Sequence, residues 1–514
     1  MRVITTASTA ALLAAASLVT AANSAAGDQK TTRKMLTAHP LSTWQTDGIV
    51  WSVEYVRGVV YVGGTFDSVR PPGAKPGEKT VARKNFAAFD AVTGKLLPCT
   101  HSFTGIGDTV RALKASPDGK RLYVGGSFNY VDKAHVHNAV ALNTGKCSLR
   151  KDFRPGVSAT VRTFETTGKT VYVGGDFTVV NHKTRNRIAA LTTSGEVLPF
   201  KLDLDRGVRA ILAVPDHNEV IIGGDFRHID GRLERSLVAV DPKTGKTVIA
   251  FPNWIPPRSV VKTLARDQDN FYLGAEGTGT GIFDGRIAAR LSDGKMLWRD
   301  GCEGATQSVL VYKGVLYSGS HAHYCGTTPG GFPEGRRRHF LAQSPGDKRI
   351  LHWFPDTNDG LGEGDGPRSM VMAGDILWAG GEFTEVNGKP QQSLTRFGTS
   401  RNAAPQAAPD LIRVDDSRSG HVTLTWRAAW DRDDANLTYL IYRDGVLVGK
   451  KKQQSAEWDR PDMTYTDSAT TGGTHRYTIA VTDGKNTTPQ SKAVKVSTDD
   501  RSQPLTAPVD VGAM

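Results

Sequence analysis

The sequence predicts an all-β protein, a seven-bladed β-propeller closed by its own N-terminal strand and followed by a small β-sandwich. Three observations support this prediction. A short strand motif with paired glycines recurs along the chain, each repeat unit reads as four strands, and the last unit lacks its fourth strand. A four-stranded repeat of about 50 residues is typical of a propeller blade.

The recurring motif reads Tyr-Val-Gly-Gly-x-Phe in its clearest copies and is degenerate in the fifth and sixth. Its first glycines are Gly63, Gly125, Gly174, Gly223, Gly274, Gly319 and Gly380. In the third unit we expect strands at 161–166, 170–177, 187–192 and 196–202, with glycines in the turns between them. The paired glycines allow neighbouring backbones to approach closely where blades crowd toward the axis.

The ends of the chain supply the prediction of ring closure. The seventh unit offers strands at 368–373, at its motif and at 393–397, and then stops. Segment 40–48 matches 199–207, where a fourth strand leads into the next unit. We therefore expect residues 40–46 to pair with residues 393–397, which removes an open sheet edge.

These repeats, with their Thr-Gly-Lys turns, resemble secreted bacterial propellers of the delta-sixty-repeat type over residues 40–397. The resemblance implies the fold. It implies little about activity, because that family is mostly of unknown function and propellers host many unrelated functions.

The remaining segments complete the expected organisation. Residues 1–26 read as a signal peptide, with Arg2 before an apolar stretch and small residues before the cleavage point, which predicts a secreted, extracellular protein. No later segment is apolar enough to span a membrane. The propeller is expected at 27–398, a linker at 399–408, a domain that resembles fibronectin type III at 409–498, and a disordered tail at 499–514.

The net charge limits the classes of partner to expect, and the number of cysteines bears on disulfides and metal sites. The formal net charge of +12 favours anionic polymers such as wall phosphate or acidic glycans, although solubility alone also accounts for it. Nucleic acid is not expected, because the basic runs lack interleaved aromatics. An even number of cysteines in a secreted chain favours disulfides over a metal site. We expect a Cys302–Cys325 bridge that braces a long loop and, by elimination, a Cys99–Cys147 bridge.

A ring of side chains is expected near the start of each unit's first strand: Trp51, Arg111, Arg162, Arg209, Lys262, Gln307 and Arg368. Wherever the residue after the glycine pair is an acid, the ring position is a cation 14 or 16 residues earlier. Such cations are expected to form structural ion pairs across the hairpin. The units that break this pattern, those of Trp51, Arg111 and Gln307, are the candidates for function.

The positions of the long loops also favour this part of the ring as the place of a functional site. Loops 70–84 and 324–338 and the acidic segment 356–365 are expected to share one face of blades 6, 7 and 1. The candidate ligand-binding residues there are Trp51, Arg111, Gln307, His321, His323, Tyr324, Arg336, Glu363 and Asp365. No cofactor is expected: the acidic segment could attract Ca²⁺ but lies off the EF-hand register, and Asp431, Asp433 and Asp434 read as a solvated turn.

The sequence thus favours a secreted binding protein for an extracellular polysaccharide or cell-wall polymer. Known catalytic motifs such as Gly-x-Ser-x-Gly and His-Glu-x-x-His are absent from it. The alternative is a secreted hydrolase or lyase that uses Glu363, Asp365 or His323 on the same face. Neither the ligand nor the oligomeric state can be read from the sequence.

Overall fold

The computed structural model describes residues 35–406, 411–417, 421–468 and 472–498. The expected signal peptide (1–26) and C-terminal tail (499–514) lie outside these residues, as does part of the expected linker. In the described parts the protein is all-β, and the one helical element is the 3₁₀ turn η1 (Pro215–His217). No helix in these parts has the length and apolar character needed to cross a bilayer.

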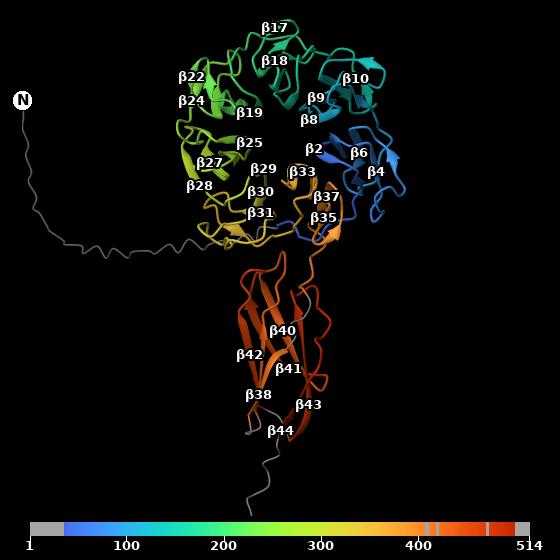
Figure 1. Cartoon of the computed structure of the whole chain (residues 1–514), viewed down its shortest axis with the longest axis vertical. Helices are drawn as coiled ribbons and strands as arrows, with labels where there is room; N and C mark the ends of the chain where they lie inside the picture. The colour runs from blue at the N-terminus through green and yellow to red at the C-terminus, as the bar shows by residue number, and fades with distance from the viewer. Residues whose placement is uncertain (1–34, 407–410, 418–420, 469–471, 499–514) are drawn as a thin grey trace, which may run out of the picture. The chain divides into compact units, whose positions relative to one another are not determined.

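Antiparallel sheets follow one another along most of the chain (Figure 1). The first contains β2 (Ile49–Val56), β3 (Val59–Thr65) and β6 (Phe86–Asp90). The second contains β8 (Thr109–Ala115), β9 (Arg121–Ser127), β12 (Ala139–Asn143) and β13 (Ser148–Leu149). The next contains β14 (Val161–Thr166), β15 (Thr170–Gly175) and β18 (Ile188–Thr192).

The later sheets repeat this order. One contains β19 (Val208–Val214), β20 (Glu219–Gly224), β23 (Leu237–Val240) and β24 (Thr247–Ala250). Another contains β25 (Ser259–Arg266), β26 (Asn270–Gly277), β27 (Gly285–Arg290) and β28 (Met296–Asp300). Then come β29 (Thr306–Tyr312), β30 (Val315–Ala322), β31 (Arg338–Gln343) and β32 (Ile350–Leu351), and last β33 (Pro367–Ala373), β34 (Ile376–Gly381) and β37 (Leu394–Phe397).

The first strand of each of these sheets is called its inner strand. Each inner strand contacts the next, from β2 through β8, β14, β19, β25 and β29 to β33, and β33 contacts β2 again, so the inner strands form a closed ring. In Figure 1 the labelled inner strands face the centre of this ring.

The paired glycines explain how closely the sheets approach. A Cβ atom on Gly63 would lie 2.4 Å from Cγ1 of Val110 on the next inner strand. A Cβ atom on Gly380 would lie 2.2 Å from Cγ1 of Val50, across the junction between the last sheet and the first. Real Cβ contacts are never this short, so only glycine fits these positions.

Groups of two or three short strands lie in the segments before and between the long strands. They form the groups β1 (Gln45–Thr46), β4 (Ser68–Arg70) and β5 (Val81–Ala82); β7 (Phe103–Thr104), β10 (Tyr130–Val131) and β11 (Ala134–His135); β16 (Val179–Val180) and β17 (Lys183–Thr184); β21 (His228–Ile229) and β22 (Arg232–Leu233); and β35 (Glu385–Val386) and β36 (Lys389–Pro390).

The N-terminal segment meets the last sheet over a shorter stretch than expected. Pro40 forms an antiparallel bridge with Phe397, and the Leu41 amide donates to the Arg396 carbonyl at 2.8 Å. Beyond Leu41, strand β1 pairs instead with β4, a short strand that the repeat motif did not indicate. Side chains maintain the contact there, since the Gln392 amide donates to Oε1 of Gln45 at 2.9 Å.

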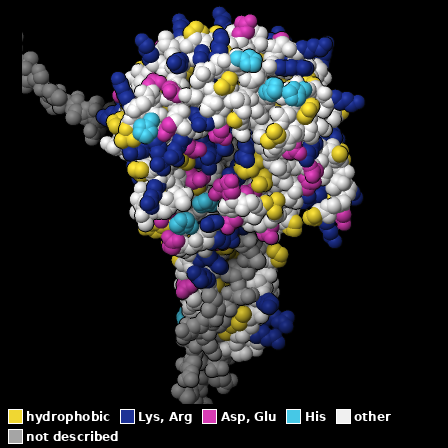
Figure 2. Space-filling model, turned by 45° about the horizontal axis from the view of Figure 1, so that its top comes forward, with side chains coloured by type: hydrophobic (Ala, Val, Ile, Leu, Met, Phe, Trp, Pro, Cys, Tyr) yellow, Lys and Arg dark blue, Asp and Glu magenta, His cyan; other side chains and the backbone are white. Residues whose placement is uncertain are grey.

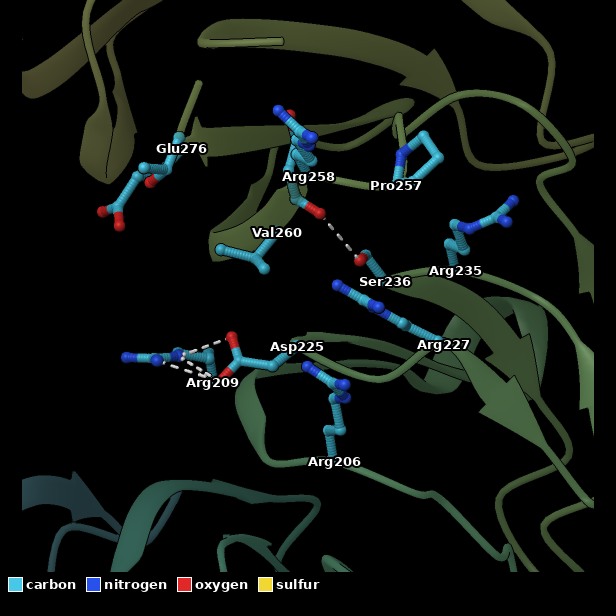
Figure 3. Close-up of a pocket in the computed structure, with 12 residues that line it drawn as sticks. Arg206, Arg209, Asp225, Arg227, Arg235, Ser236, Pro257, Arg258, Val260 and Glu276 are labelled. Atoms are coloured by element: carbon cyan, nitrogen blue, oxygen red, sulfur yellow. Dashed lines mark hydrogen bonds and ion pairs between the residues drawn. The ribbon is translucent and has the colours of Figure 1, made fainter. Parts of the chain in front are cut away.

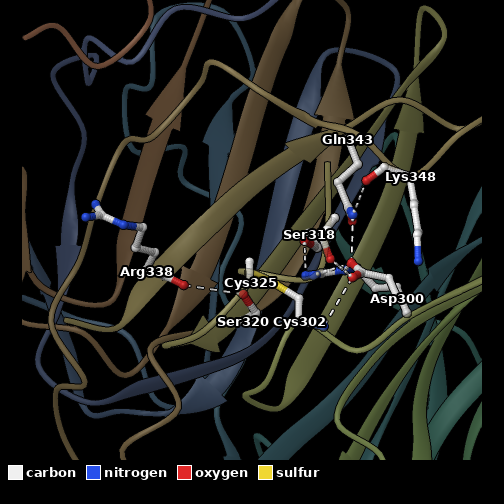
Figure 4. Close-up of a disulfide and its surroundings, with 10 residues drawn as sticks. Asp300, Cys302, Ser318, Ser320, Cys325, Arg338, Gln343 and Lys348 are labelled. Atoms are coloured by element: carbon white, nitrogen blue, oxygen red, sulfur yellow. Dashed lines mark hydrogen bonds and ion pairs between the residues drawn. A yellow bond between two sulfur atoms is a disulfide. The ribbon is translucent and has the colours of Figure 1, made fainter. Parts of the chain in front are cut away.

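Both disulfides form as expected, Cys99–Cys147 and Cys302–Cys325. Figure 4 shows the second beside Asp300, whose carboxylate is fully buried and paired with Arg286. The two cysteines lie in an apolar cluster with Phe332 and Phe354, so the bridge fixes the long 324–338 loop to the protein interior.

The C-terminal part contains two further sheets. One holds β38 (Leu411–Ser417), β39 (His421–Arg427) and β42 (Asp462–Asp467); the other holds β41 (Val446–Gln454), β40 (Asn436–Arg443), β43 (Gly473–Thr482) and β44 (Val494–Thr498). Alternate residues of β39, β40 and β43 are buried, and together they form one core around Trp426 and Tyr439.

Candidate functional site

A register irregularity occurs at the same point of every inner strand. The pairing between inner and second strand skips one residue at Trp51, Arg111, Arg162, Arg209, Lys262, Gln307 and Arg368. These are the seven ring positions singled out in the sequence. A bulge of this kind frees a residue from the ladder and redirects its side chain. All seven residues line one cavity of about 650 Å³ at the centre of the ring, the channel cavity.

The expected ion pairs around this cavity are confirmed. Arg162 pairs with Asp176 at 2.7 Å, and Lys262 pairs with Glu276 at 2.7 Å. The other two pairs, each at 2.8 Å, are Arg209–Asp225 and Arg368–Glu382. Figure 2 shows basic and acidic side chains interspersed around the hollow on the face it displays. These pairs hold the bulged side chains in place and neutralise much of their charge.

Arg111 is the ring cation without such a partner in the described parts of the chain. Its guanidinium lies over the Trp51 ring, 4.1 Å from the centroid, and Arg368 lies 4.6 Å from the same centroid. Burial and the charge of Arg162 lower the pKa of Arg111 to about 10, so it remains a cation at neutral pH. Trp51 therefore positions two cations at the cavity.

The remaining acids at the cavity are also held by neighbours. Gln307 donates from Nε2 to Glu276 at 2.6 Å and to Asp365 at 3.0 Å. Asp365 also lies 3.0 Å from Nδ1 of His321, and Glu363 accepts from Arg368 at 2.8 Å.

The pKa values of the two buried acids follow from these contacts. Burial opposes the ionisation of Asp365, but the contact with His321 and the Arg368 charge outweigh it and keep the pKa below its usual value. Burial of Glu276 is likewise outweighed by the charge of Lys262 and by hydrogen bonds, so its pKa is also lowered. Both carboxylates are ionised and fixed at neutral pH.

The nine predicted ligand residues do not form one site. Trp51, Arg111, Gln307 and Glu363 line the channel cavity, with Asp365 and His321 in contact with Gln307 or with each other. The other three lie elsewhere. His323 bonds Glu334 at 3.0 Å, Tyr324 forms an isolated bridge with Glu303, and Arg336 pairs with Asp356 at a separate cavity of about 330 Å³.

A second basic cavity of about 490 Å³ opens beside the channel cavity, and it was not predicted. We call it the arginine pocket, after Arg206, Arg209, Arg227, Arg235 and Arg258 in its lining. Arg206 and Arg258 come from the loops that precede β19 and β25, and Arg209 comes from β19 itself. Arg227 and Arg235 come from the segment between β20 and β23. In Figure 3 they surround one space, and Arg209 alone among them is joined to a carboxylate, that of Asp225.

The other four arginines make no ion pair with any described carboxylate. Arg206, Arg227 and Arg258 are exposed, and Nε of Arg235 is buried without a hydrogen-bond partner. The two cavities share Arg209 and Glu276 in their linings, so the arginine pocket continues into the channel cavity. Together with Arg111, this surface holds five cations without a carboxylate partner among the described residues.

The repeats did contain a signal for two of these arginines. The residue after the motif phenylalanine is Asp67, Asn129, Thr178 or Thr384 in other units, and only Arg227 is basic there. Likewise Arg206 occupies the position that Asp47 holds in the matching N-terminal segment. Both arginines thus depart from the residue types at the matching loop positions of other units.

Comparison with known proteins identifies no family. No family model matches the chain, and no curated protein matches it. Among solved structures, the computationally designed Ika8 protein is 12% identical, with 82% of this chain and 100% of that chain covered and a TM-score of 0.42. A chain of the mitotic checkpoint complex is 12% identical, with 71% and 96% covered and a TM-score of 0.45. Sqt1 from Saccharomyces cerevisiae is 10% identical, with 76% and 95% covered and a TM-score of 0.39. Likenesses this weak carry no argument about function.

Proposed function

We propose that this chain is a secreted binding protein whose ligand is an anionic glycan or cell-wall polymer, bound in the arginine pocket and the adjoining channel cavity. In this proposal the ring of sheets is a seven-bladed β-propeller of the delta-sixty-repeat type, and the two C-terminal sheets are a fibronectin type III-like sandwich. The observation that carries the proposal is the set of arginines around one cavity without carboxylate partners.

Arginine is suited to this role. Its planar guanidinium presents several N–H donors that match the oxygens of a carboxylate, phosphate or sulfate in a bidentate arrangement. Cations gathered in a concave surface also strengthen the local positive potential and attract anions. Elsewhere on the ring the same residue type is neutralised, as Arg162 and Arg368 are. Unpaired arginines at one place therefore favour an external anion as their partner.

The connection between the cavities favours an extended ligand. The arginine pocket and the channel cavity share Arg209 and Glu276, so a chain with repeated anionic groups can contact Arg227 or Arg258 and also approach Arg111. A monosaccharide or single phosphate would fill one cavity only. The two disulfides and the absence of a membrane-spanning helix from the described residues are compatible with an extracellular setting.

This proposal moves the ligand from blades 6, 7 and 1 toward the sheets of β19 and β25. The acids of segment 356–365 are matched internally, since His339 contacts both Asp356 and Asp359 and since Arg368 contacts Glu363. The hydrolase alternative needs a carboxyl group with a raised pKa as its general acid. Asp365 has a lowered pKa instead, so it does not meet this requirement.

The test is binding of immobilised polymers to the secreted protein. The variant R227Q/R258Q removes two pocket cations, and K95Q/K151Q removes the same charge from exposed lysines that do not line either cavity. Probes are teichoic acid for phosphate, polygalacturonate for carboxylate, dextran as a neutral glycan and duplex DNA. A guanidinium–anion hydrogen bond contributes about 1.5 kcal/mol, so we expect the pocket variant to bind about tenfold or more weakly.

The expected pattern is binding to teichoic acid or polygalacturonate, little binding to dextran, and weakening by salt because the contacts are ionic. The lysine control should bind like the wild type. Equal losses in both double variants would assign the binding to net charge alone and contradict the proposal. Equal affinity for DNA would contradict the assignment to a glycan or wall polymer.

A further inference from the structure

Three aspartates converge in the loop between β39 and β40. Asp431, Asp433 and Asp434 each place a carboxylate oxygen within 4.8 Å of the others. Asp431 is 1% exposed, and the other two are partly buried. The sequence had indicated a solvated turn here, but the structure places the first carboxylate in the interior.

Two of the carboxylate oxygens are buried and have no hydrogen-bond donor. Oδ1 of Asp431 accepts from the amides of Asp433 at 2.9 Å and Asp434 at 3.3 Å, whereas its Oδ2 has no partner. Oδ2 of Asp433 accepts from the amides of Ala38 and Ala403, whereas its Oδ1 has no partner. A buried carboxylate oxygen without a donor costs considerable free energy, so both oxygens lack an expected ligand.

The nearby cationic side chains are directed to other groups. Arg432 donates to the Phe354 carbonyl at 3.1 Å, and Lys485 donates to Oδ1 of Asn402 at 3.1 Å. In the described parts of the chain, no Lys, Arg or His side chain forms an ion pair with any of the three aspartates. Three carboxyl groups therefore converge at one point, and none of them has an ion-pair partner among the described residues.

We propose that Asp431, Asp433 and Asp434 bind a calcium ion. All three ligands are oxygen donors on a loop, and no cysteine or histidine belongs to the cluster, which favours a hard cation over zinc or copper. Calcium accepts mono- and bidentate carboxylates in irregular geometry and is common in extracellular modules. The unpartnered Oδ2 of Asp431 and Oδ1 of Asp433 are its natural ligands.

The ion would also stabilise a junction of three segments. Asp433 already binds the amides of Ala38 and Ala403, and Asp434 accepts from Asn402 at 2.6 Å. Neutralising the aspartates would strengthen the positioning of residues 402 and 403 beside the C-terminal sheets. Arg401, which precedes them, is exposed and offers a trypsin site.

A second acidic group, Glu303, His323 and Glu334, gives a useful control. Its two glutamates are exposed, and His323 is already bonded to Glu334. The variant E334Q should therefore retain calcium binding. A control within the C-terminal sheets is D462N, because Asp462 is exposed at the start of β42 and outside the cluster.

The experiment measures thermal unfolding, terbium luminescence and trypsin cleavage of the full secreted chain after chelation. Trp430, beside the cluster in the chain, can sensitise bound terbium. With about 1 mM calcium we expect the wild type, E334Q and D462N to gain roughly 3 °C or more in Tm, with slower cleavage after Arg401. D431N keeps an oxygen for the two amides, so it should fold, but it should bind terbium about tenfold or more weakly and gain no Tm from calcium.

Comparing the Tm of the metal-free and calcium-loaded proteins distinguishes a bound calcium ion from a proton shared by Asp431 and Asp433. If the two unpartnered oxygens simply share a proton, calcium will not change the Tm of the wild type, and the proposal is wrong. It is equally wrong if D431N responds to calcium as the wild type does. A metal-free D431N at least as stable as the metal-free wild type, combined with loss of its calcium response, supports the site.

Discussion

The buried ion pair between Arg286 and Asp300 provides a quantitative test of how the ring is held together. The two residues are direct cross-strand neighbours on β27 and β28, both side chains are 0% exposed, and Nη2 of Arg286 lies 2.7 Å from Oδ2 of Asp300. Gln343 and Thr328 donate to the same carboxylate. Substituting D300N retains the shape but leaves the guanidinium without its counter-charge.

Breaking one member of a buried pair costs about 3–5 kcal/mol, because the remaining charge stays desolvated. The same strand supplies a matched control, because Arg290 pairs with Asp293 at 2.9 Å with both side chains about half exposed. Such a pair contributes about 0.2–1 kcal/mol. D300N should therefore lower the free energy of unfolding several times more than D293N.

Scanning calorimetry and urea unfolding at neutral pH measure this difference. The double variant R286M/D300L removes both charges and should recover part of the loss, because no uncompensated charge remains although Gln343 and Thr328 lose their acceptor. Equal effects of D300N and D293N, or no recovery in the double variant, would show that the buried, unpaired charge of Arg286 does not determine the loss of stability.

The pH dependence of D300N provides an independent check. Burial opposes ionisation of Asp300, but the charge of Arg286 and the hydrogen bonds it accepts outweigh burial and keep the pKa below 3.8. Its contribution is therefore present at neutral pH and lost as the pH falls through the folded-state pKa. The stability gap between wild type and D300N should narrow in acid.

Two further predictions concern the ring interior. G380A places a Cβ atom against Val50 at the junction of the last and first sheets, and it should lower the free energy of unfolding by about 1–3 kcal/mol. The control G346A has open space around the added Cβ atom, so it should change that free energy by no more than about 0.5 kcal/mol in the same unfolding assay. Burial raises the pKa of Glu54 to about 7 despite the opposing charge of Lys114, so its protonated form stabilises the fold and that stability is lost as the pH rises from about 4.5 through about 7. E54Q should flatten this part of the pH–stability curve, and an unchanged curve would show that Glu54 is not responsible.

The elements that repeat along the chain were the ones the sequence predicted. The spacing of Arg162 and Asp176, copied in later units, indicated their ion pair because a hairpin fixes which residues face each other. The bulge that directs these side chains inward was not predicted, since it depends on the register of two strands. The Cys302–Cys325 disulfide followed from the positions of its cysteines on neighbouring loops, and Cys99–Cys147 followed by elimination.

The candidate site was harder to predict because loops do not repeat. A long loop can display its residues or pack them, and the 324–338 loop does both. Phe332 is 2% exposed beside the disulfide, whereas residues 333–337 are exposed. The acidic segment 356–365 looked available but is neutralised by partners distant in sequence, such as His339 and Arg368. The arginine pocket combines loops of two units, and no single motif contains it.

The central claim is that the unpaired arginines bind a polyanion. The most direct measurement is a crystal structure of the secreted protein with a short glycerol-phosphate or galacturonate oligomer. We expect anionic groups bonded to Arg227 and Arg258, with the oligomer continuing toward Arg111. An oligomer bound instead beside His323 and Tyr324, with the arginine pocket free of it, would show that the unpaired arginines are not the binding site.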